Sequence, residues 1–499
     1  METGSRQRTD GFPYLVALLM VLVAGAALRF WGLKFGLPAA LLHLDEPPIV
    51  LRAQRILETG DWNPHWFHYP SLYIYVQVAL QSAMRFVGRV DPFLLARIST
   101  AVAGILTIWV TWALGSRMYS RTVGLVSALF LAVNFLHARE SHFATVDGMA
   151  TLWVSLCIYL SLRASREGGN WSRDFLLAAV MVGLAAGTKY NAALVGVVPL
   201  AVVAMGRGRW SRWIQGGRII AVAMAVFLAS TPYAVADWAT FLGDVRFEIG
   251  HYREGHFGFE GDFNAGYFAG YLFSPGMGEG VVILVLLGLV RWAFSRERVF
   301  VPALVFLALY YASISAVRVN FVRNLLPVLP VLCLLGARGL DLVLGRLPLE
   351  GRLRTVTVVA LVTGLVVLPL WRIGVHDRAI SNSTRVAAGE WIEQHVPAGS
   401  TLAIELYGPD PIPPGYRVIR LLHLPDRPVR WYEEQGVDYL IASSGAYEMA
   451  YSNRARYPEI VRQYEEIFRR FPVVMEFEGE GVDPLYSSIC PTIRMLGTH

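Results

Sequence analysis

The stretch FPYLVALLMVLVAGAALRFWGLKFGLPAALLHLDEPP, residues 12–48, joins a long apolar run to an acidic pair. Its first part, about residues 12–33, is long and apolar enough to cross a bilayer, which takes ~20 residues. Because this part is long for a signal peptide and carries Arg29 near its end, we interpret it as a membrane anchor. The acidic pair Asp45–Glu46 follows where the chain should enter water. Such a pair suits either a solvated loop that caps a helix or a catalytic base.

The composition excludes a soluble enzyme and a nucleic-acid-binding protein. Of the 499 residues, 55% are hydrophobic and only 16% are charged, which is typical of a polytopic membrane protein. Lys34 and Lys189 are the only lysines, and the arginines are dispersed between apolar runs instead of forming a basic patch. Cys157, Cys333 and Cys490 are too few for a disulfide framework.

The apolar runs predict about eleven transmembrane helices. They lie near residues 12–33, 94–115, 122–137, 145–162, 174–188, 191–206, 218–236, 280–294, 300–316, 324–340 and 355–371. Arginine clusters at 117–121, 163–173, 207–218, 291–298 and 338–354 mark the cytoplasmic side. The N-terminus then lies inside, and the odd number of helices puts the C-terminal tail outside.

Residues 70–88, PSLYIYVQVALQSAMRFVG, test this topology, because a span there would move every later arginine cluster to the wrong face. We therefore expect an interfacial or half-inserted helix with its tyrosines at the headgroup level. The outer face then carries two long loops, 34–91 and 237–278. The second loop is rich in glycine and aromatic residues, which suits either a mobile lid over a site or a structural loop.

Ionisable residues gather on the predicted outer face, although they are costly at a membrane boundary. Besides Asp45 and Glu46, they are Arg139, Asp147, Lys189, Arg318 and Arg323. Each cation by itself could simply extend to the lipid headgroups. Together, acids and cations that face one compartment indicate a site that holds an anionic phosphate and positions a base. A lipid-linked phosphate suits such a site, because its tail can stay in the bilayer.

Histidines on the outer face are candidate ligands for a divalent metal ion. His43, His65, His68, His142, His251 and His256 all lie on predicted outer segments. The candidate metal ligands among the outer residues are His43, Asp45, His68 and His256. No spacing matches a standard zinc motif, and hydrogen-bonding or interfacial histidines would also explain the pattern.

Residues 376–499 predict a small soluble α/β domain that follows a membrane domain, residues 1–375, and lies outside the cytoplasm. Predicted helices at 384–395 and 457–470 alternate with strands at 401–407, 438–444, 473–477 and 492–496, and a proline-rich loop, PDPIPPGYRV, covers 409–418. The tail contains no glycine-rich phosphate motif. We expect it to pack over the membrane part or to recognise an acceptor.

Several of these motifs resemble the glycosyltransferase C superfamily, over about residues 12–371. They are HLDE at 43–46, NPHWFHYPSL at 63–72, the segment that ends in Asp147, Thr188–Lys189–Tyr190, and RNLLP at 323–327. The chain is similar to the protein O-mannosyltransferases and to the aminoarabinose transferases that modify lipid A. Where the latter have an acidic residue before Pro-Pro-Leu, this chain has His68 before Tyr69, a departure that affects any shared metal site.

The resemblance implies an inverting transfer of a sugar from a polyprenyl-phosphate donor, on the outer side of a bacterial inner membrane. The acceptor would be a hydroxyl group of a lipid, a glycan or a protein. Asp45 would be the general base, supported by Glu46, and Asp147 would be the second acid of the site. The remaining site residues would be Lys189, Arg139, Arg318 and Arg323 at the donor phosphate, and His68, Tyr69, Tyr190, His251 and His256 at the substrate or its lid.

A membrane transporter or lipid flippase is the alternative prediction. That class favours inverted repeats and broken helices with polar groups near the midplane of the bilayer. This chain has no clear internal repeat, and its polar residues cluster at one interface. An anchored binding protein would leave the outer acids and cations unexplained. We therefore favour a glycosyltransferase, in which Asp45, Asp147 and Lys189 share one pocket.

Overall fold

The computed structural model describes residues 12–37, 43–86, 88, 90–166, 173–206, 209–295, 297–348, 350–481 and 489–498. The chain divides into two compact units. The helical unit comprises Met1–Trp31, Pro48–Glu254 and Gly261–Ile373, and the tail unit comprises Gly32–Pro47, Gly255–Glu260 and Gly374–His499. Two short segments, 32–47 and 255–260, therefore group with the C-terminal residues and not with their neighbours along the chain.

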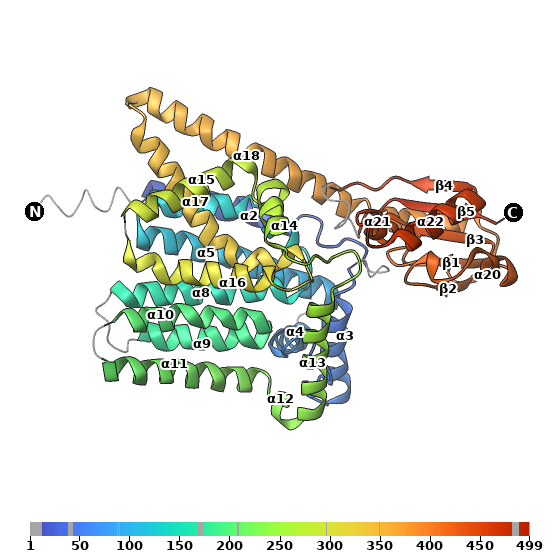
Figure 1. The fold of residues 1–499 in the computed structure, drawn as a ribbon, viewed down its shortest axis with the longest axis horizontal. Helices are drawn as coiled ribbons and strands as arrows, with labels where there is room; N and C mark the ends of the chain where they lie inside the picture. Colours follow the sequence, from blue (N-terminus) through green and yellow to red (C-terminus); the bar gives the residue numbers. More distant parts are fainter. Residues whose placement is uncertain are drawn as a thin grey trace, which may run out of the picture. The chain divides into compact units, whose positions relative to one another are not determined.

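The helical unit is a bundle of apolar helices joined by shorter elements (Figure 1). The bundle helices are α2 (Phe12–Phe30), α5 (Pro92–Met118), α6 (Arg121–Ala132), α8 (Val146–Arg166), α9 (Arg173–Thr188), α10 (Val197–Met205), α11 (Arg209–Ser230), α15 (Glu279–Ser295), α16 (Val301–Ser315), α17 (Leu329–Arg346) and α18 (Gly351–Ser381). The shorter elements are α3 (Pro47–Thr59), α4 (Leu72–Met84), α7 (Phe135–Glu140), η1 (Tyr190–Gly196), α12 (Tyr233–Ala236), α13 (Trp238–Glu254), α14 (Ala265–Tyr271), η2 (Leu272–Gly276), η3 (Arg298–Phe300) and η4 (Val322–Val328).

Seven helices in the described ranges are long and apolar enough to cross a membrane, by length and composition alone. They are Phe12–Phe30, Pro92–Met118, Val146–Ser165, Ser211–Ser230, Arg298–Ser315, Val322–Arg346 and Gly351–His395. The remaining predicted runs also form helices, but α6, α9, α10 and α15 have only 12, 16, 9 and 17 residues. The predicted polytopic helical membrane protein is confirmed, whereas the number of about eleven spans stays a prediction.

The basic turns of the helical unit lie at one end of the bundle, on the left in Figure 1. Arg121, Arg173, Arg209 and Arg298 each begin a helical element at this end, and Arg346 ends one. Since neighbouring helices in the bundle alternate in direction, every second turn returns to the same end. The arginine pattern of the sequence therefore grouped these turns correctly.

The other end of the bundle carries helices that run across its long axis. In Figure 1, α3 and α13 stand across the bundle, and α4 is seen end-on. Helix α4 has 13 residues, which reach about 20 Å at 1.5 Å per residue, too short for a hydrocarbon core of about 30 Å. The segment 70–88 thus contains a short helix, and its interfacial or half-inserted position stays a prediction. The predicted loop 237–278 is largely helical, because it contains α13 and α14.

The tail unit contains a five-stranded sheet in the order β2-β1-β3-β5-β4. Its elements are α19 (Thr384–His395), β1 (Thr401–Ile404), β2 (Arg417–Arg420), η5 (Leu424–Asp426), α20 (Val429–Glu434), β3 (Tyr439–Ser443), α21 (Ser444–Tyr451), α22 (Pro458–Arg470), β4 (Val473–Phe477) and β5 (Ile493–Gly497). Strand β1 is parallel to β2 and β3, with Ala403 opposite Ile419 and Leu440. Strand β5 is antiparallel to β3 and β4. The predicted α/β tail is confirmed.

Apolar clusters cover both faces of the central strand β1. Leu402 and Ile404 pack with Ile392 of α19 on one face, and Ala403 packs with Tyr464 of α22 on the other. Because both faces are buried, β1 is a continuous apolar run instead of an alternating one. Strand β2 was not predicted, since it is a four-residue edge strand directly after the proline-rich loop and its two end residues are exposed.

Glu405 is a buried carboxyl group directly after β1. Its Oε1 accepts a hydrogen bond from Ser443 N at 2.7 Å, and its Oε2 accepts hydrogen bonds from Leu424 N at 2.9 Å and from Tyr464 Oη at 2.7 Å. Burial raises the pKa of Glu405 from 4.5 to about 7 in spite of these bonds. This one side chain therefore joins three other segments of the domain, and its charge changes near neutral pH.

We predict that the stability of the tail unit falls as the pH rises from 4.5 to about 7. In this window the folded state keeps a Glu405 proton that the unfolded state has lost, which costs about 3 kcal/mol in total. Glu405→Gln cannot titrate, so the variant should lack this slope. Hydrogen exchange of the β1 and β3 amides in the full chain, compared between the two proteins at each pH, measures the difference. Parallel pH profiles would contradict the prediction.

Candidate active site

Asp147, Lys189 and Asn324 form a buried polar cluster inside the helical unit. Lys189 Nζ donates hydrogen bonds to Asp147 Oδ1 at 2.6 Å and to Asn324 Oδ1 at 2.7 Å. The three residues are 2%, 5% and 0% exposed in the order Asp147, Lys189, Asn324. A buried ion pair is retained only when its charges are well hydrogen-bonded, because removing them from water is costly. The predicted proximity of Asp147 and Lys189 is therefore present in the structure.

Three different parts of the chain position this cluster. Asp147 lies in the first turn of α8, where the helix dipole favours a negative charge. Lys189 is the extended residue between the end of α9 and the start of η1. Asn324 lies in η4, immediately before α17. Each polar residue is thus placed at a break between helical elements, at the same end of its neighbouring long helices.

The cluster has unused hydrogen-bonding capacity. Asp147 Oδ2 and Asn324 Nδ2 are buried and have no hydrogen-bond partner among the described residues. Arg323 Nε lies 4.0 Å from Asp147 Oδ2, and the Arg323 guanidinium stacks over the ring of Phe321. The Lys189 ammonium has three N–H groups, of which Asp147 and Asn324 accept two. A bound anionic or polar group would satisfy what remains, since buried polar atoms are rarely left unpaired.

An apolar groove leads to Lys189. The groove has a volume of about 420 Å³. Its lining includes Lys189, Tyr190, Asn191, Ile314 and Val317, together with His68 and Tyr69 from the loop before α4 and Val245, Glu248, Ile249, Tyr252 and Arg253 from α13. Mostly apolar walls with a few convergent polar groups are typical of a site for an amphipathic ligand. Lys189, Tyr190, His68 and Tyr69, all predicted from the sequence, therefore share one groove.

The loop before α4 is tied to α13 by carboxylates. Asp244 Oδ2 accepts a hydrogen bond from Phe67 N at 2.6 Å, and Glu248 Oε1 lies 2.7 Å from His68 Nδ1. On the other side of the loop, Tyr190 Oη donates to Phe67 O at 2.7 Å. These contacts fix the loop between α13 and η1. His68 is therefore placed by an acidic partner at the wall of the groove.

A second carboxylate site holds the start of the same loop. Asp237 Oδ2 accepts a hydrogen bond from Asn63 Nδ2 at 2.8 Å and lies 3.6 Å from His65 Nδ1, while Asp61 Oδ2 lies 2.8 Å from His65 Nε2. The hydrogen bond with His65 is the main interaction that lowers the pKa of Asp61. The hydrogen bond with Asn63 is the main interaction that lowers the pKa of Asp237. Both carboxylates are therefore ionised and available to hold this loop.

Asp45 and Glu46 lie in a tight turn that belongs to the tail unit. Asp45 N donates a hydrogen bond to His43 Nδ1 at 3.3 Å, and Glu46 N donates to His43 O at 3.4 Å. Glu46 is 1% exposed, whereas Asp45 is half-buried. The more accessible Asp45 suits a proton acceptor better than Glu46 does. Its predicted proximity to Asp147 and Lys189 stays a prediction.

The other predicted cations have partners of their own. Arg139 is buried, pairs with Glu140 and donates to Tyr271 Oη at 3.0 Å. Arg318 Nη2 lies 3.3 Å from the exposed Asp262 carboxylate. The structure thus places Arg323 beside Asp147 and gives Arg139 and Arg318 separate acidic partners. The predicted role of all three at the donor phosphate stays a prediction.

Two predicted histidines lie at and beyond the end of α13. His251 stacks on Phe247, with ring centroids 6.2 Å apart, and His256 packs against Phe259 at 6.0 Å. His251 belongs to the helical unit and His256 to the tail unit. Neither residue lines the groove. Their predicted role at a substrate or lid stays a prediction.

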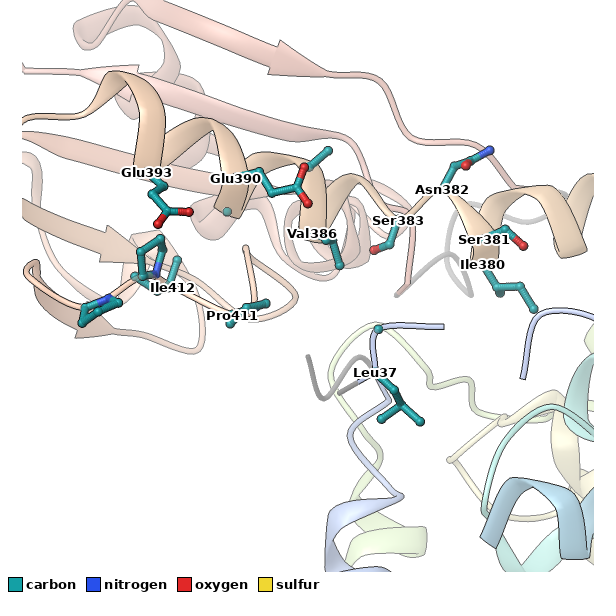
Figure 2. A pocket seen from close by; sticks show the side chains of 15 residues that line it. Leu37, Ile380, Ser381, Asn382, Ser383, Val386, Glu390, Glu393, Pro411 and Ile412 are labelled. Carbon is teal, nitrogen blue, oxygen red and sulfur yellow. The ribbon is translucent and has the colours of Figure 1, made fainter. Parts of the chain in front are cut away.

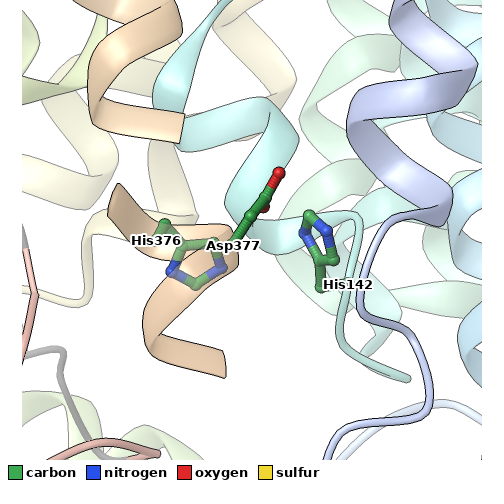
Figure 3. Close-up of side chains that lie close together, drawn as sticks. All are labelled: His142, His376 and Asp377. Carbon is green, nitrogen blue, oxygen red and sulfur yellow. The ribbon is translucent and has the colours of Figure 1, made fainter. Parts of the chain in front are cut away.

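The metal candidates His43, Asp45, His68 and His256 do not form a group of three closely spaced ligands within the described part of either unit. Figure 3 shows His142 of the helical unit and, from α18, His376 and Asp377 of the tail unit. Within the helical unit, His142 Nδ1 lies 2.9 Å from Ala138 O and His142 Nε2 lies 3.0 Å from Trp31 O. Because a metal binds an unprotonated imidazole nitrogen, His142 would first have to give up one of these contacts.

The tail unit has a cavity of its own, with a volume of about 670 Å³. Figure 2 shows Glu390 and Glu393 of α19 in its lining, together with Pro411 and Ile412 of the proline-rich loop. Leu37 from segment 32–47 lines another part of it. Carboxylates beside apolar surface suit a polar ligand with apolar faces, such as a saccharide.

The predicted site residues include neither Asn324, although it lies in the RNLLP motif, nor the acidic residues of α13. Asn324 stands in the same motif as the predicted Arg323, but an amide carries no charge to mark it. The acidic residues Asp237, Asp244 and Glu248 are seven and four residues apart. Residues at these intervals lie on the same side of a helix. That spacing was a usable signal, and treating 237–278 as a loop obscured it.

The family model of dolichyl-phosphate-mannose-protein mannosyltransferases matches residues 82–235 of this chain. The matched range contains Arg139, Asp147 and Lys189, but it does not reach Asp45 or Arg323. A comparison with curated protein sequences finds no match.

Solved structures with a similar arrangement include ArnT from Cupriavidus metallidurans. Its apo state matches with a TM-score of 0.57 and 14% identity, and its undecaprenyl-phosphate-bound state with 0.53 and 15%, each over 98% of both chains. AglB, an archaeal oligosaccharyltransferase from Archaeoglobus fulgidus in complex with an inhibitory peptide and a dolichol-phosphate, matches with 0.55 and 11%, over 90% of this chain and 72% of that one. An oligosaccharyltransferase of that organism, in complex with Zn and sulfate, matches with 0.54 and 11%, over 93% and 73%.

At these identities the likeness to solved structures establishes the fold. The chain shares this fold with ArnT and AglB, and the mannosyltransferase family model matches residues 82–235 within it. The resemblance that the sequence motifs predicted is thereby confirmed.

Proposed function

We propose that this chain is a membrane glycosyltransferase that takes a sugar from a polyprenyl-phosphate donor and transfers it to an acceptor hydroxyl group. The observation that carries the proposal is the buried cluster of Lys189, Asp147 and Asn324 at an apolar groove. A cation held by a buried carboxylate, with one N–H still unassigned, suits a phosphate oxygen. The apolar walls suit the first part of a lipid chain. ArnT was solved with undecaprenyl phosphate and AglB with a dolichol-phosphate, which supports this choice of ligand.

The proposed reaction is a single displacement with inversion. The acceptor oxygen bonds to the anomeric carbon of the sugar while the bond from that carbon to the phosphate oxygen breaks. Asp45 takes the acceptor proton, and the lipid phosphate leaves with the bonding electrons. Lys189, with Arg323 beside Asp147, stabilises the negative charge that grows on the phosphate. In this scheme Asp147 and Asn324 hold the Lys189 ammonium in place, and Glu46 supports the turn that carries Asp45.

The acceptor of the proposed reaction is a lipid, a glycan or a protein hydroxyl group. The tail cavity beside Glu390, Glu393 and the proline-rich loop is our candidate for acceptor recognition. Carboxylates accept hydrogen bonds from sugar hydroxyls, and the neighbouring proline and isoleucine side chains suit the apolar face of a sugar ring.

The proposed location is the inner membrane of a bacterium, with the basic turns in the cytoplasm and the tail unit outside. The positive-inside rule supports this orientation, since Arg121, Arg173, Arg209 and Arg346 lie at one end of the bundle. The Lys189 cluster lies at the ends of helices opposite to those turns. The donor lipid would therefore be bound at the outer leaflet.

A divalent metal ion stays a prediction, and the proposed reaction has no step that depends on one.

Binding of undecaprenyl phosphate to the purified protein in detergent tests the donor site. We expect the phosphate lipid to stabilise the protein by about 2.7 kcal/mol at 100 times its dissociation constant, and undecaprenol, which lacks the phosphate, to stabilise it less. The double variant Asp147→Asn/Lys189→Met removes both charges of the pair, and it should lose the difference between the two lipids. A double variant that still prefers the phosphate lipid would exclude Lys189 as its ligand.

A further inference from the structure

A cavity lined by aromatic rings lies at the end of α11, within the helical unit. It has a volume of about 510 Å³. Its lining consists of three aromatic side chains and three small ones, namely Trp62, Tyr75 and Tyr233, and Ala229, Pro232 and Ala236. None of these residues lines the groove that contains Lys189. The cavity is therefore a second concave site, which the proposed sugar transfer does not use.

The rings of this cavity are held in place, yet one of them stays accessible. The Trp62 and Tyr75 rings are tilted against each other with centroids 6.2 Å apart, and Tyr75 Oη donates a hydrogen bond to Trp62 O at 3.0 Å. The Tyr75 hydroxyl also interacts electrostatically with Tyr233 and with Asp61. Trp62 is nevertheless 54% exposed. A fixed tryptophan ring with a free face is well suited to contact a ligand.

Helix α11 leads from this cavity along the surface of the bundle. The helix is apolar and long enough to span a membrane, yet only 11% of its apolar stretch is buried in the structure. Ile220, Met224 and Leu228 are exposed and four residues apart, so they form one stripe along the helix. Ala229 of the cavity directly follows Leu228. An acyl chain that lies along this stripe would place its headgroup in the cavity.

The charges beside the cavity favour a cation in it. Asp61 and Asp237 are chain neighbours of two of the lining residues. His65 lies between them, with Nε2 2.8 Å from Asp61 Oδ2 and Nδ1 3.6 Å from Asp237 Oδ2, and Arg55 Nη2 lies 3.4 Å from Asp61 Oδ2. Two ionised carboxylates thus meet one arginine and one histidine. The lining itself contains no basic side chain, so an anionic headgroup would find no counter-charge there.

We propose that this cavity binds a phospholipid whose headgroup ends in an ammonium group, such as phosphatidylethanolamine. The faces of aromatic rings attract an ammonium group through their quadrupole, and the neighbouring carboxylates add to this attraction. The acyl chains of the lipid lie along the exposed stripe of α11. All residues of the site belong to the helical unit. The proposal holds for any reaction at the groove, because the two sites share no lining residue.

Native mass spectrometry of the full chain in detergent tests the site with two lipids of the same acyl chains, phosphatidylethanolamine and phosphatidylglycerol. The double variant Trp62→Leu/Tyr233→Leu keeps apolar side chains but removes two rings. It should bind phosphatidylethanolamine about tenfold more weakly than the wild type does. Its binding of phosphatidylglycerol should not change. Trp62→Leu alone, at an exposed side chain, should weaken phosphatidylethanolamine binding at least threefold, so the test does not depend on the folding of the double variant.

Trp213→Leu is the matched control, since Trp213 is a tryptophan of α11 that is 72% exposed and does not line the cavity. It should bind both lipids as the wild type does. Unchanged phosphatidylethanolamine binding in Trp62→Leu and in the double variant would overturn the proposal. An equal loss for both lipids would overturn it as well, because the rings would then hold lipids without regard to the ammonium group. The same loss in Trp213→Leu would reduce the effect to tryptophan at a membrane interface in general, and so would also contradict a defined site.

Discussion

Asp45→Asn should abolish sugar transfer while the protein still folds and inserts. An amide cannot take the acceptor proton, and general base catalysis typically contributes 10²–10⁴-fold to the rate, so we expect a loss of about that size. Asparagine has the same shape and keeps the backbone hydrogen bond to His43. Mass spectrometry of cell-envelope glycans, from cells with equal amounts of wild type and variant, measures the effect and also shows which class of acceptor is modified.

Glu58→Gln is the matched control for this experiment. Glu58 is also a carboxylate of the predicted outer segment 34–91, but it is exposed near the end of α3. We expect the envelope glycans of this variant to match those of the wild type. Asp45→Asn with unchanged turnover would remove Asp45 from the mechanism, whereas a loss in both variants would indicate damage to the outer loop in general.

Lys189→Met should destabilise the helical unit by about 3–5 kcal/mol, because it leaves the Asp147 carboxylate buried without its cation. Methionine fills a similar volume, so a cavity contributes little to the loss. The double variant Asp147→Asn/Lys189→Met should recover most of the stability, since it leaves no unpaired charge. Thermal unfolding in detergent, in the absence of lipid, measures the three proteins under the same conditions.

The comparison with an exposed ion pair makes this result specific. Arg318→Met removes the partner of Asp262, which is 92% exposed, and should change the stability by less than about 1 kcal/mol. If Lys189→Met alone were as stable as the double variant, the Asp147–Lys189 pair could not be the buried ion pair that the structure shows. Transfer activity should be lost in both Lys189 variants, because both lack the ligand of the phosphate.

The sequence predicted the elements whose signal lies in local composition. The apolar runs gave the bundle helices, and the arginines at their ends gave the two ends of the bundle. The helix at 384–395 and the strand at 473–477 have the predicted boundaries. In each case the pattern follows from burial or from the distribution of charge, which a single segment already contains.

The sequence could not predict features that depend on contacts between distant segments. Asp147 and Lys189 were candidates as separate charges, but their direct bond and the amide of Asn324 appear only when α8, α9 and η4 meet. The glycine and aromatic residues of 237–278 predict a loop, whereas the structure forms helix α13 there. Its acidic side is explained by its partners at 63–68, which lie more than 170 residues away along the chain.

A structure of the protein with undecaprenyl phosphate in a lipid nanodisc would locate the donor site. We expect the phosphate within hydrogen-bonding distance of Lys189 Nζ, the lipid chain in the groove between α13 and η1, and the Asp45 carboxylate facing the same pocket. A phosphate bound away from Lys189, or an Asp45 carboxylate that opens to the other side of the membrane, would contradict this expectation.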